Sequence, residues 1–299
     1  MQLNFALHGN ILRWCSSFAR YANRQGKHEK KEHPHGAKVV SSFALPDALR
    51  MKTHLTIDHK PYVADLSEGI DLSIAITEGP QVNAYYAAPA DMEPFRQGDW
   101  VGEVRQGGSV NYRTVRFSPH GNGTHTECVG HITPEIHSIN RCFSQFHCAA
   151  QLISITPSLR ENGDRAIEAH QLKPLLHGSI DAVIVRTLPN PETKQRLNHS
   201  GANSPYFSAQ AVQLLVEMGC KHILTDLPSL DREQDEGKLA AHHIFWNYPA
   251  APRMDSTITE LIYVPNSAVD GLYLLNLQVA AFENDAAPSR PVIFALREA

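Results

Sequence analysis

No stretch of this 299-residue chain reaches the ~18 consecutive apolar residues that a membrane-spanning helix requires. The longest candidate, from Leu272 to Phe282, is interrupted by Asn276 and Gln278. The chain also lacks a CxxC pair, and its five scattered cysteines indicate a reducing compartment rather than a disulfide framework. A formal net charge of -4 excludes an overall basic field that would recruit nucleic acid. We therefore expect a cytoplasmic protein that has neither a membrane nor nucleic acid as its partner.

An abrupt change of charge separates the first fifty residues from the rest. Residues 1–50 carry eight Lys or Arg against three acidic residues, whereas residues 51–299 carry 19 against 28. The run from Gln25 to Lys38 is almost free of apolar side chains and cannot bury enough surface to fold. We expect residues 1–50 to be a disordered basic extension, or the product of a start codon assigned upstream of Met51. Its acid-poor, arginine-containing beginning also resembles a transit peptide. The folded domain is expected over residues 51–299.

The domain shows short apolar runs around one clear helix. That helix is expected to begin after Ser208, whose hydroxyl can cap it, and to end at Gly219. Because buried strands precede and follow it, the sequence predicts an α/β fold with some parallel pairing. We expect strands at Tyr62–Leu66, Leu72–Ile76, Val110–Phe117, Gln151–Ile155, Ala182–Val185, His222–Thr225, Leu272–Val279 and Pro291–Leu296, a second helix within Glu168–Leu176, and loops over Asn83–Gly108 and Asn190–Ser204.

Histidine is unusually frequent, with 17 residues, and four of these lie between residues 117 and 138. At the centre of this segment, His125 and Glu127 would share one face of an extended strand, since alternate residues point the same way. Gly121 and Gly123 allow a bend through which His120 could fold back toward them. A set of two histidines and one carboxylate suits zinc, manganese or iron(II). The segment therefore predicts a metal site.

Further ligands must come from elsewhere in the chain. The candidates are the segment from Asp226 to Asp231, one histidine of the adjacent pair His242 and His243, and Glu260. Cys128 would point away from Glu127 on a strand, so we expect it to pack as a small residue. His137 is expected to be structural.

The segment from His120 to His131 reads HGNGTHTECVGH. It resembles the signature H-x-G-T-H-x-D-x-x-x-H of the cyclase family of metal-dependent hydrolases, which includes kynurenine formamidases and isatin hydrolases. The resemblance covers about residues 62–299 and includes the DLS that begins at Asp65, the stretch HILTDLPSLD that begins at His222, and the AHH that begins at Ala241. It implies a single α/β domain with a mixed β-sheet flanked by helices, of the swivelling β/β/α type.

The same resemblance implies roles for individual residues. It places the metal ligands on His120, His125, Glu127, His242 and Glu260, and the catalytic histidine on His131. Three features depart from the family pattern. Gly121 occupies the position of the first signature histidine, so a one-residue insertion is needed to bring in His120, with Asn122 as the next candidate. Glu127 stands where most members have Asp. The 18 residues from His242 to Glu260 exceed the usual gap.

The implied activity is hydrolysis of a carbon–nitrogen bond in an amide, N-formyl or cyclic amide substrate by a metal-bound hydroxide. It would be arylformamidase-like, as in tryptophan catabolism, and performed by a homodimer that holds one or two divalent ions, zinc first and manganese second. His131 would move the proton from water to the leaving nitrogen. Formamidases of this family carry a motif with a tryptophan near the N-terminus, and this chain lacks it. Tyr85, Tyr86 or Trp246 would therefore have to stack on the substrate.

Two other functions remain open from the residues alone. One is a non-catalytic, metal-stabilised ligand-binding domain, although structural sites usually employ four Cys or His ligands. The other is a mononuclear iron(II) oxygenase with two histidines and one carboxylate.

Overall fold

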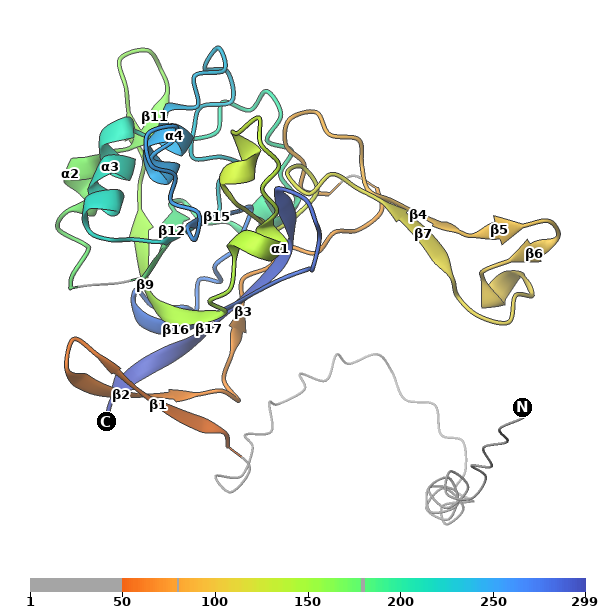
Figure 1. Ribbon diagram of the computed structural model, residues 1–299, viewed down its shortest axis with the longest axis horizontal. Coiled ribbons are helices and arrows are strands. Elements are labelled where there is room, and N and C mark those ends of the chain that lie inside the picture. The colour runs from red at the N-terminus through yellow and green to blue at the C-terminus, as the bar shows by residue number, and fades with distance from the viewer. Residues whose placement is uncertain (1–49, 80, 179–180) are drawn as a thin grey trace, which may run out of the picture. The chain divides into compact units, whose positions relative to one another are not determined.

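The computed structural model describes residues 50–79, 81–178 and 181–299 (Figure 1). The expected basic extension therefore lies almost wholly outside the described residues. No helix within the described ranges has the length and apolar character needed to span a membrane.

The central feature is a mixed β-sheet that closes on itself. Seven strands follow one another in the order β17-β16-β9-β12-β14-β15-β8, and β8 pairs again with β17. The run β9-β12-β14-β15 is parallel, and the remaining pairs are antiparallel. The strands are β8 (His125–Glu127), β9 (His147–Ile155), β12 (Ala182–Thr187), β14 (His222–Thr225), β15 (Thr257–Glu260), β16 (Gly271–Val279) and β17 (Ala286–Glu298). This barrel-like sheet confirms the expected mixed α/β fold.

Short strands and helices surround the barrel. The end of β17 pairs with β2, which pairs in turn with β1. A ribbon of β4 and β7 leads away from the barrel to β5 and β6 (Figure 1). The strands are β1 (Lys52–Ile57), β2 (Lys60–Asp65), β3 (Ile70–Asp71), β4 (Asp91–Pro94), β5 (Arg96–Gln97), β6 (Trp100–Val101), β7 (Arg113–Arg116), β10 (Ser158–Leu159), β11 (Arg165–Ile167) and β13 (Tyr206–Phe207). The helices are α1 (Ile139–Cys142), α2 (Ala169–Leu172), α3 (Ala209–Glu217) and α4 (Ala240–Trp246), with 3₁₀ turns at Val104–Gln106, Val129–His131 and Glu192–Arg196.

Helices α3 and α4 cover one face of the sheet. The Ser208 side chain accepts a hydrogen bond from the Ala211 backbone N–H at 3.1 Å, which caps α3 as expected. Leu215 and Phe245 are fully buried between these helices and the barrel. Truncating such a side chain to Ala typically costs about 2–5 kcal/mol, so this packing holds α4 firmly against the barrel.

Most of the expected core strands are present, one expected strand is absent, and two other expected segments are present but differ in detail. The strand expected at Leu72–Ile76 is replaced by the short β3, because the Ser73 N–H and hydroxyl both donate to the Asp71 side chain and turn the chain. The helix expected within Glu168–Leu176 lasts for only four residues, since Pro174 supplies no backbone N–H to continue it. The expected loop at Asn83–Gly108 contains β4, β5 and β6.

Candidate metal centre

The bend that precedes β8 depends on close backbone packing. A Cβ atom on Gly123 would lie 2.8 Å from Ile76 Cγ1, and one on Gly121 would lie 2.4 Å from the Ala87 Cβ. Neither glycine has a positive φ. Their role is therefore to let the bend contact the segment of residues 74–87, rather than to supply a left-handed conformation.

β8 carries His125 and Glu127, the first pair of candidate ligands, between β15 and β17. His125 lies opposite Glu260 of β15 in the ladder, and Glu127 lies opposite Ala286 of β17. Both β8 side chains are fully buried. His125 Nε2 lies 3.4 Å from Glu260 Oε2. The register thus brings the histidine and the glutamate together from segments that are 135 residues apart.

Glu127 contacts three histidines, and these four residues together with His125 and Glu260 form the cluster described below. Glu127 Oε2 lies 3.1 Å from His120 Nδ1 and 3.7 Å from His131 Nδ1, and Glu127 Oε1 lies 3.2 Å from His242 Nε2. One carboxylate therefore faces three imidazoles. Glu127 is also the residue that the two groups of candidate ligand atoms have in common.

Asp231 fixes the position of His242. Its Oδ2 accepts hydrogen bonds from the His242 backbone N–H at 3.0 Å and contacts the ring Nδ1 at 2.6 Å, while Oδ1 accepts from the Ala241 N–H at 2.8 Å. Nδ1 is thereby engaged, and Nε2 faces the cluster. The neighbouring His243 turns away and contacts the Tyr248 carbonyl oxygen at 3.2 Å. Only the first member of the pair belongs to the site.

The donor atoms fit a divalent cation. Two groups, His120 with Glu127 and His131, and His125 with Glu127 and Glu260, each place their ligand atoms within 4.8 Å of one another. They share Glu127. The buried His125 Nε2 has no hydrogen-bonding partner among the described residues, which is costly unless a ligand occupies that position. Nitrogen and carboxylate donors of this kind suit zinc or manganese.

Within the cluster, the negative charges of the carboxylates and the positive charges of protonated histidines compensate each other. Burial opposes protonation of His120, yet its contacts with Asp285 and Glu127 raise its pKa to about 10. Burial likewise opposes protonation of His242, but Asp231 and Glu127 raise its pKa to about 10. Burial works against the charged form of Glu127, and the surrounding imidazoles hold its pKa well below the ordinary value. A cation that binds here must therefore displace protons.

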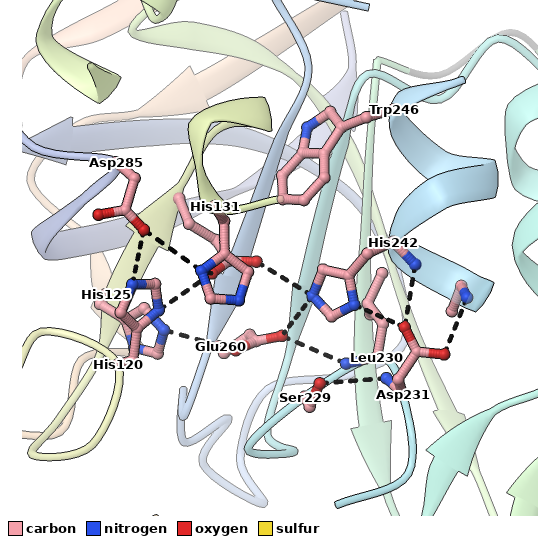
Figure 2. A network of polar contacts seen from close by, with 12 residues as sticks. His120, His125, His131, Ser229, Leu230, Asp231, His242, Trp246, Glu260 and Asp285 are labelled. Atoms are coloured by element: carbon pink, nitrogen blue, oxygen red, sulfur yellow. Dashed lines mark hydrogen bonds and ion pairs between the residues drawn. The ribbon is translucent and has the colours of Figure 1, made fainter. Parts of the chain in front are cut away.

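Asp285 belongs to the site, although sequence reasoning did not find it. Its Oδ2 lies 2.9 Å from His120 Nε2 and 3.2 Å from His131 Nδ1 (Figure 2). The residue directly precedes β17, 154 residues after His131. No local spacing links it to the histidine segment, and only the β8–β17 pairing brings the two together.

The two tyrosines expected at the substrate site occupy a turn with unusual backbone angles. Tyr85 and Tyr86 both have φ of 55°, a left-handed conformation that is uncommon outside glycine. The Tyr85 hydroxyl donates to the Pro228 carbonyl at 3.3 Å, and the Tyr86 N–H donates to Ser200 Oγ at 2.9 Å. Tyr85 is 42% exposed and Tyr86 73% exposed. The turn lies against the bend at Gly121, because the Ala84 N–H donates to the Gly121 carbonyl.

Trp246 is placed differently from the tyrosines. It is fully buried, its indole N–H donates to the Ser256 carbonyl at 2.9 Å, and its ring centroid lies 5.5 Å from that of His242. Because its ring has no exposed face, Trp246 packs against His242 and is not available to stack on a substrate.

Two other residues near the cluster, Cys128 and Asn122, make structural contacts. Cys128 is fully buried in the core, and its thiol points to the His137 carbonyl at 3.5 Å. Asn122 uses its side chain within the bend, where Oδ1 accepts from the Ser118 N–H and Nδ2 donates to the Ala88 carbonyl. His120, and not Asn122, is therefore the residue that contacts Glu127.

Comparisons with known proteins identify the family and support the fold. The family model described as "Putative cyclase" matches residues 70–232. The kynurenine formamidase of Bacillus thuringiensis (strain Al Hakam) is 26% identical over 232 residues, covering 76% of this chain and 97% of the relative. Isatin hydrolase A from Labrenzia aggregata, bound to benzyl benzoate, aligns with a TM-score of 0.58 at 16% identity, covering 76% of this chain and 93% of that one. A potential metal-dependent hydrolase with cyclase activity aligns with a TM-score of 0.57 at 15% identity, covering 78% and 99%.

Proposed function

The chain belongs to the cyclase family, and from this premise we propose that it is a metal-dependent hydrolase that cleaves a carbon–nitrogen bond. The substrates would be small amides, N-formyl amines or cyclic amides, as the names of its relatives suggest. We propose zinc as the ion, with manganese as the alternative. The ligands would be His120, His125, Glu127, His242 and Glu260.

The observation that carries the proposal is the shared position of Glu127. This one buried carboxylate contacts imidazoles from the bend, from the 3₁₀ turn and from α4. Structural zinc sites are closed by four Cys or His ligands, whereas this cluster combines two carboxylates with a histidine that is partly exposed. The arrangement therefore favours a reactive centre over a structural ion.

His131 is the residue proposed to move protons. Its Nδ1 is engaged by Asp285, which leaves Nε2 to accept a proton from the attacking water and to return it to the leaving nitrogen. When bound, a divalent cation supplies Lewis-acid polarisation of the carbonyl and makes water nucleophilic at neutral pH. Amine leaving groups depart poorly without a proton, so this transfer is needed for amides more than for esters.

Tyr85 and Tyr86 are proposed to contact the substrate. Both are partly exposed, and their turn packs on the bend that carries His120. An aryl group stacked on such a ring would be aligned with the cluster. This supports aryl formamides and fused lactams as the first substrates to screen.

We also propose that the protein acts as a homo-oligomer. The ribbon of β4 to β7 bears a cluster of three partly exposed aromatic rings, Phe95, Trp100 and Tyr112, with centroids 5.2–6.4 Å apart. Large exposed apolar clusters usually mark contact sites. Light scattering of the purified protein measures the assembly directly.

The proposed activity is tested with protein purified without chelators. Metal content is measured, the ion is removed, and hydrolysis of N-formyl aryl amines, lactams and cyclic imides is followed before and after adding Zn²⁺ or Mn²⁺. We expect hydrolysis that disappears on metal removal and returns on reconstitution. Metal-independent turnover, or oxygen consumption in step with product, would contradict hydrolysis and favour the oxygenase alternative.

A further inference from the structure

We propose that Asp285 is a positioning residue that holds His131 in the tautomer and orientation needed for proton transfer. The inference rests on the proposed hydrolytic function, which makes His131 the acid–base group. It adds to that function a specific carboxylate from the far end of the chain. Asp285 lies outside both groups of candidate ligand atoms.

The backbone holds this carboxylate in place from two sides. The Cys128 N–H donates to the Asp285 carbonyl at 3.0 Å, and the Ile139 N–H donates to the Asn284 carbonyl at 2.8 Å. The next residue, Ala286, is paired with Glu127 in the sheet. The backbone of Asp285 is therefore held in place, one residue before the point at which β17 pairs with Glu127 of β8.

A single oxygen of Asp285 serves two imidazoles. Oδ2 lies 2.9 Å from His120 Nε2 and 3.2 Å from His131 Nδ1. The two rings lie side by side, with centroids 4.4 Å apart and an interplanar angle of 33°. A carboxylate at this point favours the N–H form of the nitrogen that faces it on each ring. On His131 this means a proton on Nδ1 and a free lone pair on Nε2.

The charge of Asp285 matters as well as its position. When His131 takes a proton from water at Nε2, the ring becomes an imidazolium that faces Asp285 at 3.2 Å and Glu127 at 3.7 Å. Glu127 is the carboxylate that both candidate ligand groups share, and a bound cation would compensate its charge. Asp285 remains as the anion that stabilises the protonated ring until the proton passes to the leaving nitrogen.

A competing role for Asp285 would be to orient His120 alone as a metal ligand. Removal of such a partner usually lowers metal affinity about 10–100-fold. The two roles differ in what they change. Loss of orientation at His131 slows the chemical step and leaves the ion in place, whereas loss at His120 weakens binding of the ion.

The test compares Asp285→Asn with Glu283→Gln as the matched control. Glu283 lies two residues earlier, and its carboxylate contacts Ser138, Asn140 and Arg141 instead of the cluster. We expect Asp285→Asn to keep its Zn²⁺ stoichiometry and KM. It should lose about 10²–10³-fold in kcat on an aryl formamide, less on an activated ester, and add little in a His131→Asn background. The control should match the unmodified protein.

A spectroscopic readout separates failure of this inference from failure of the proposed function. In protein labelled with ¹⁵N-histidine, the His131 ring, assigned by its loss in His131→Asn, should show the Nδ1–H tautomer and should shift in Asp285→Asn. Asp285→Ser offers the same comparison if the first variant does not fold. An unchanged His131 ring, a loss of Zn²⁺ binding, or equal rate losses on amide and ester would overturn the inference. Absence of hydrolysis by the unmodified protein with the tautomer shift intact would instead refute the proposed function.

Discussion

Replacing Glu260 with Gln should stabilise the metal-free protein while destroying its cation site. Glu260 is 3% exposed, and its carboxylate lies within 4.8 Å of that of Glu127. Burial, together with the charge of Glu127, raises the pKa of Glu260 above its ordinary value of 4.5. Because the folded state then holds this proton more tightly than the unfolded state, stability falls as the pH rises from about 4.5 through the raised pKa.

The magnitude follows from the separation of the charges. Two unit charges 4.8 Å apart repel by about 3 kcal/mol at an effective dielectric constant of about 20. His242, whose Nε2 lies 3.9 Å from Glu260 Oε1, offsets part of this repulsion. The Gln side chain can still accept the hydrogen bond that Leu230 N–H donates to Glu260 at 3.2 Å. We therefore expect the metal-free variant to be about 1–3 kcal/mol more stable than the metal-free parent at pH 8.

Urea unfolding in the presence of a chelator, at pH 5 and pH 8, measures this difference. The gain should be largest at pH 8 and shrink at pH 5. Adding Zn²⁺ at a thousandfold excess over its Kd should stabilise the parent by about 4 kcal/mol and leave the variant almost unchanged. The exposed Glu161→Gln serves as the control for loss of one charge. A metal-free variant that is less stable at pH 8, or one that still gains stability from Zn²⁺, would refute the reasoning.

Three further predictions concern individual parts of the chain. His125→Ala should lose metal and activity together, measured by metal analysis and turnover, whereas His243→Ala should keep both because its ring points away from the cluster. His131→Asn should keep the metal but lose about 10²–10⁴-fold in amide hydrolysis and less with activated esters; loss of the ion would make it a ligand. A truncated protein that begins at Met51 should retain its metal content and its urea midpoint, and a large loss in either would show that the removed residues contribute to the domain.

Local pattern was sufficient for three of the four parallel strands, β9, β12 and β14. The helix capped by Ser208 and the strand His222–Thr225 agree with the expectations, because their apolar runs and terminal residues act locally. β15 was missed. Its sequence TITE is polar, yet all four residues are buried. A strand that lines a ligand cluster buries polar side chains, so hydrophobic alternation cannot reveal it.

The residues of the candidate site also fall into those that local sequence could predict and those that it could not. His125 and Glu127 could be placed together because both lie on one three-residue strand, where the side-chain period decides. The turn that carries Tyr85 could be named only as an aromatic segment, since its left-handed backbone leaves no signal in the residue types. Trp246 was assigned to the substrate because its type suits stacking, but type does not report burial.

The seam that closes the barrel explains why the remaining residues could not be found. β8 pairs with β15 on one side and with β17 on the other. It thereby draws Glu260 and Asp285 to a segment that precedes them by more than a hundred residues. Both candidate ligand groups contain Glu127 of β8, so neither group is complete without the strand that closes the sheet. A cation held by Glu127 and Glu260 would join two strands of this seam, so its binding energy would stabilise the closed sheet as well as the active cluster.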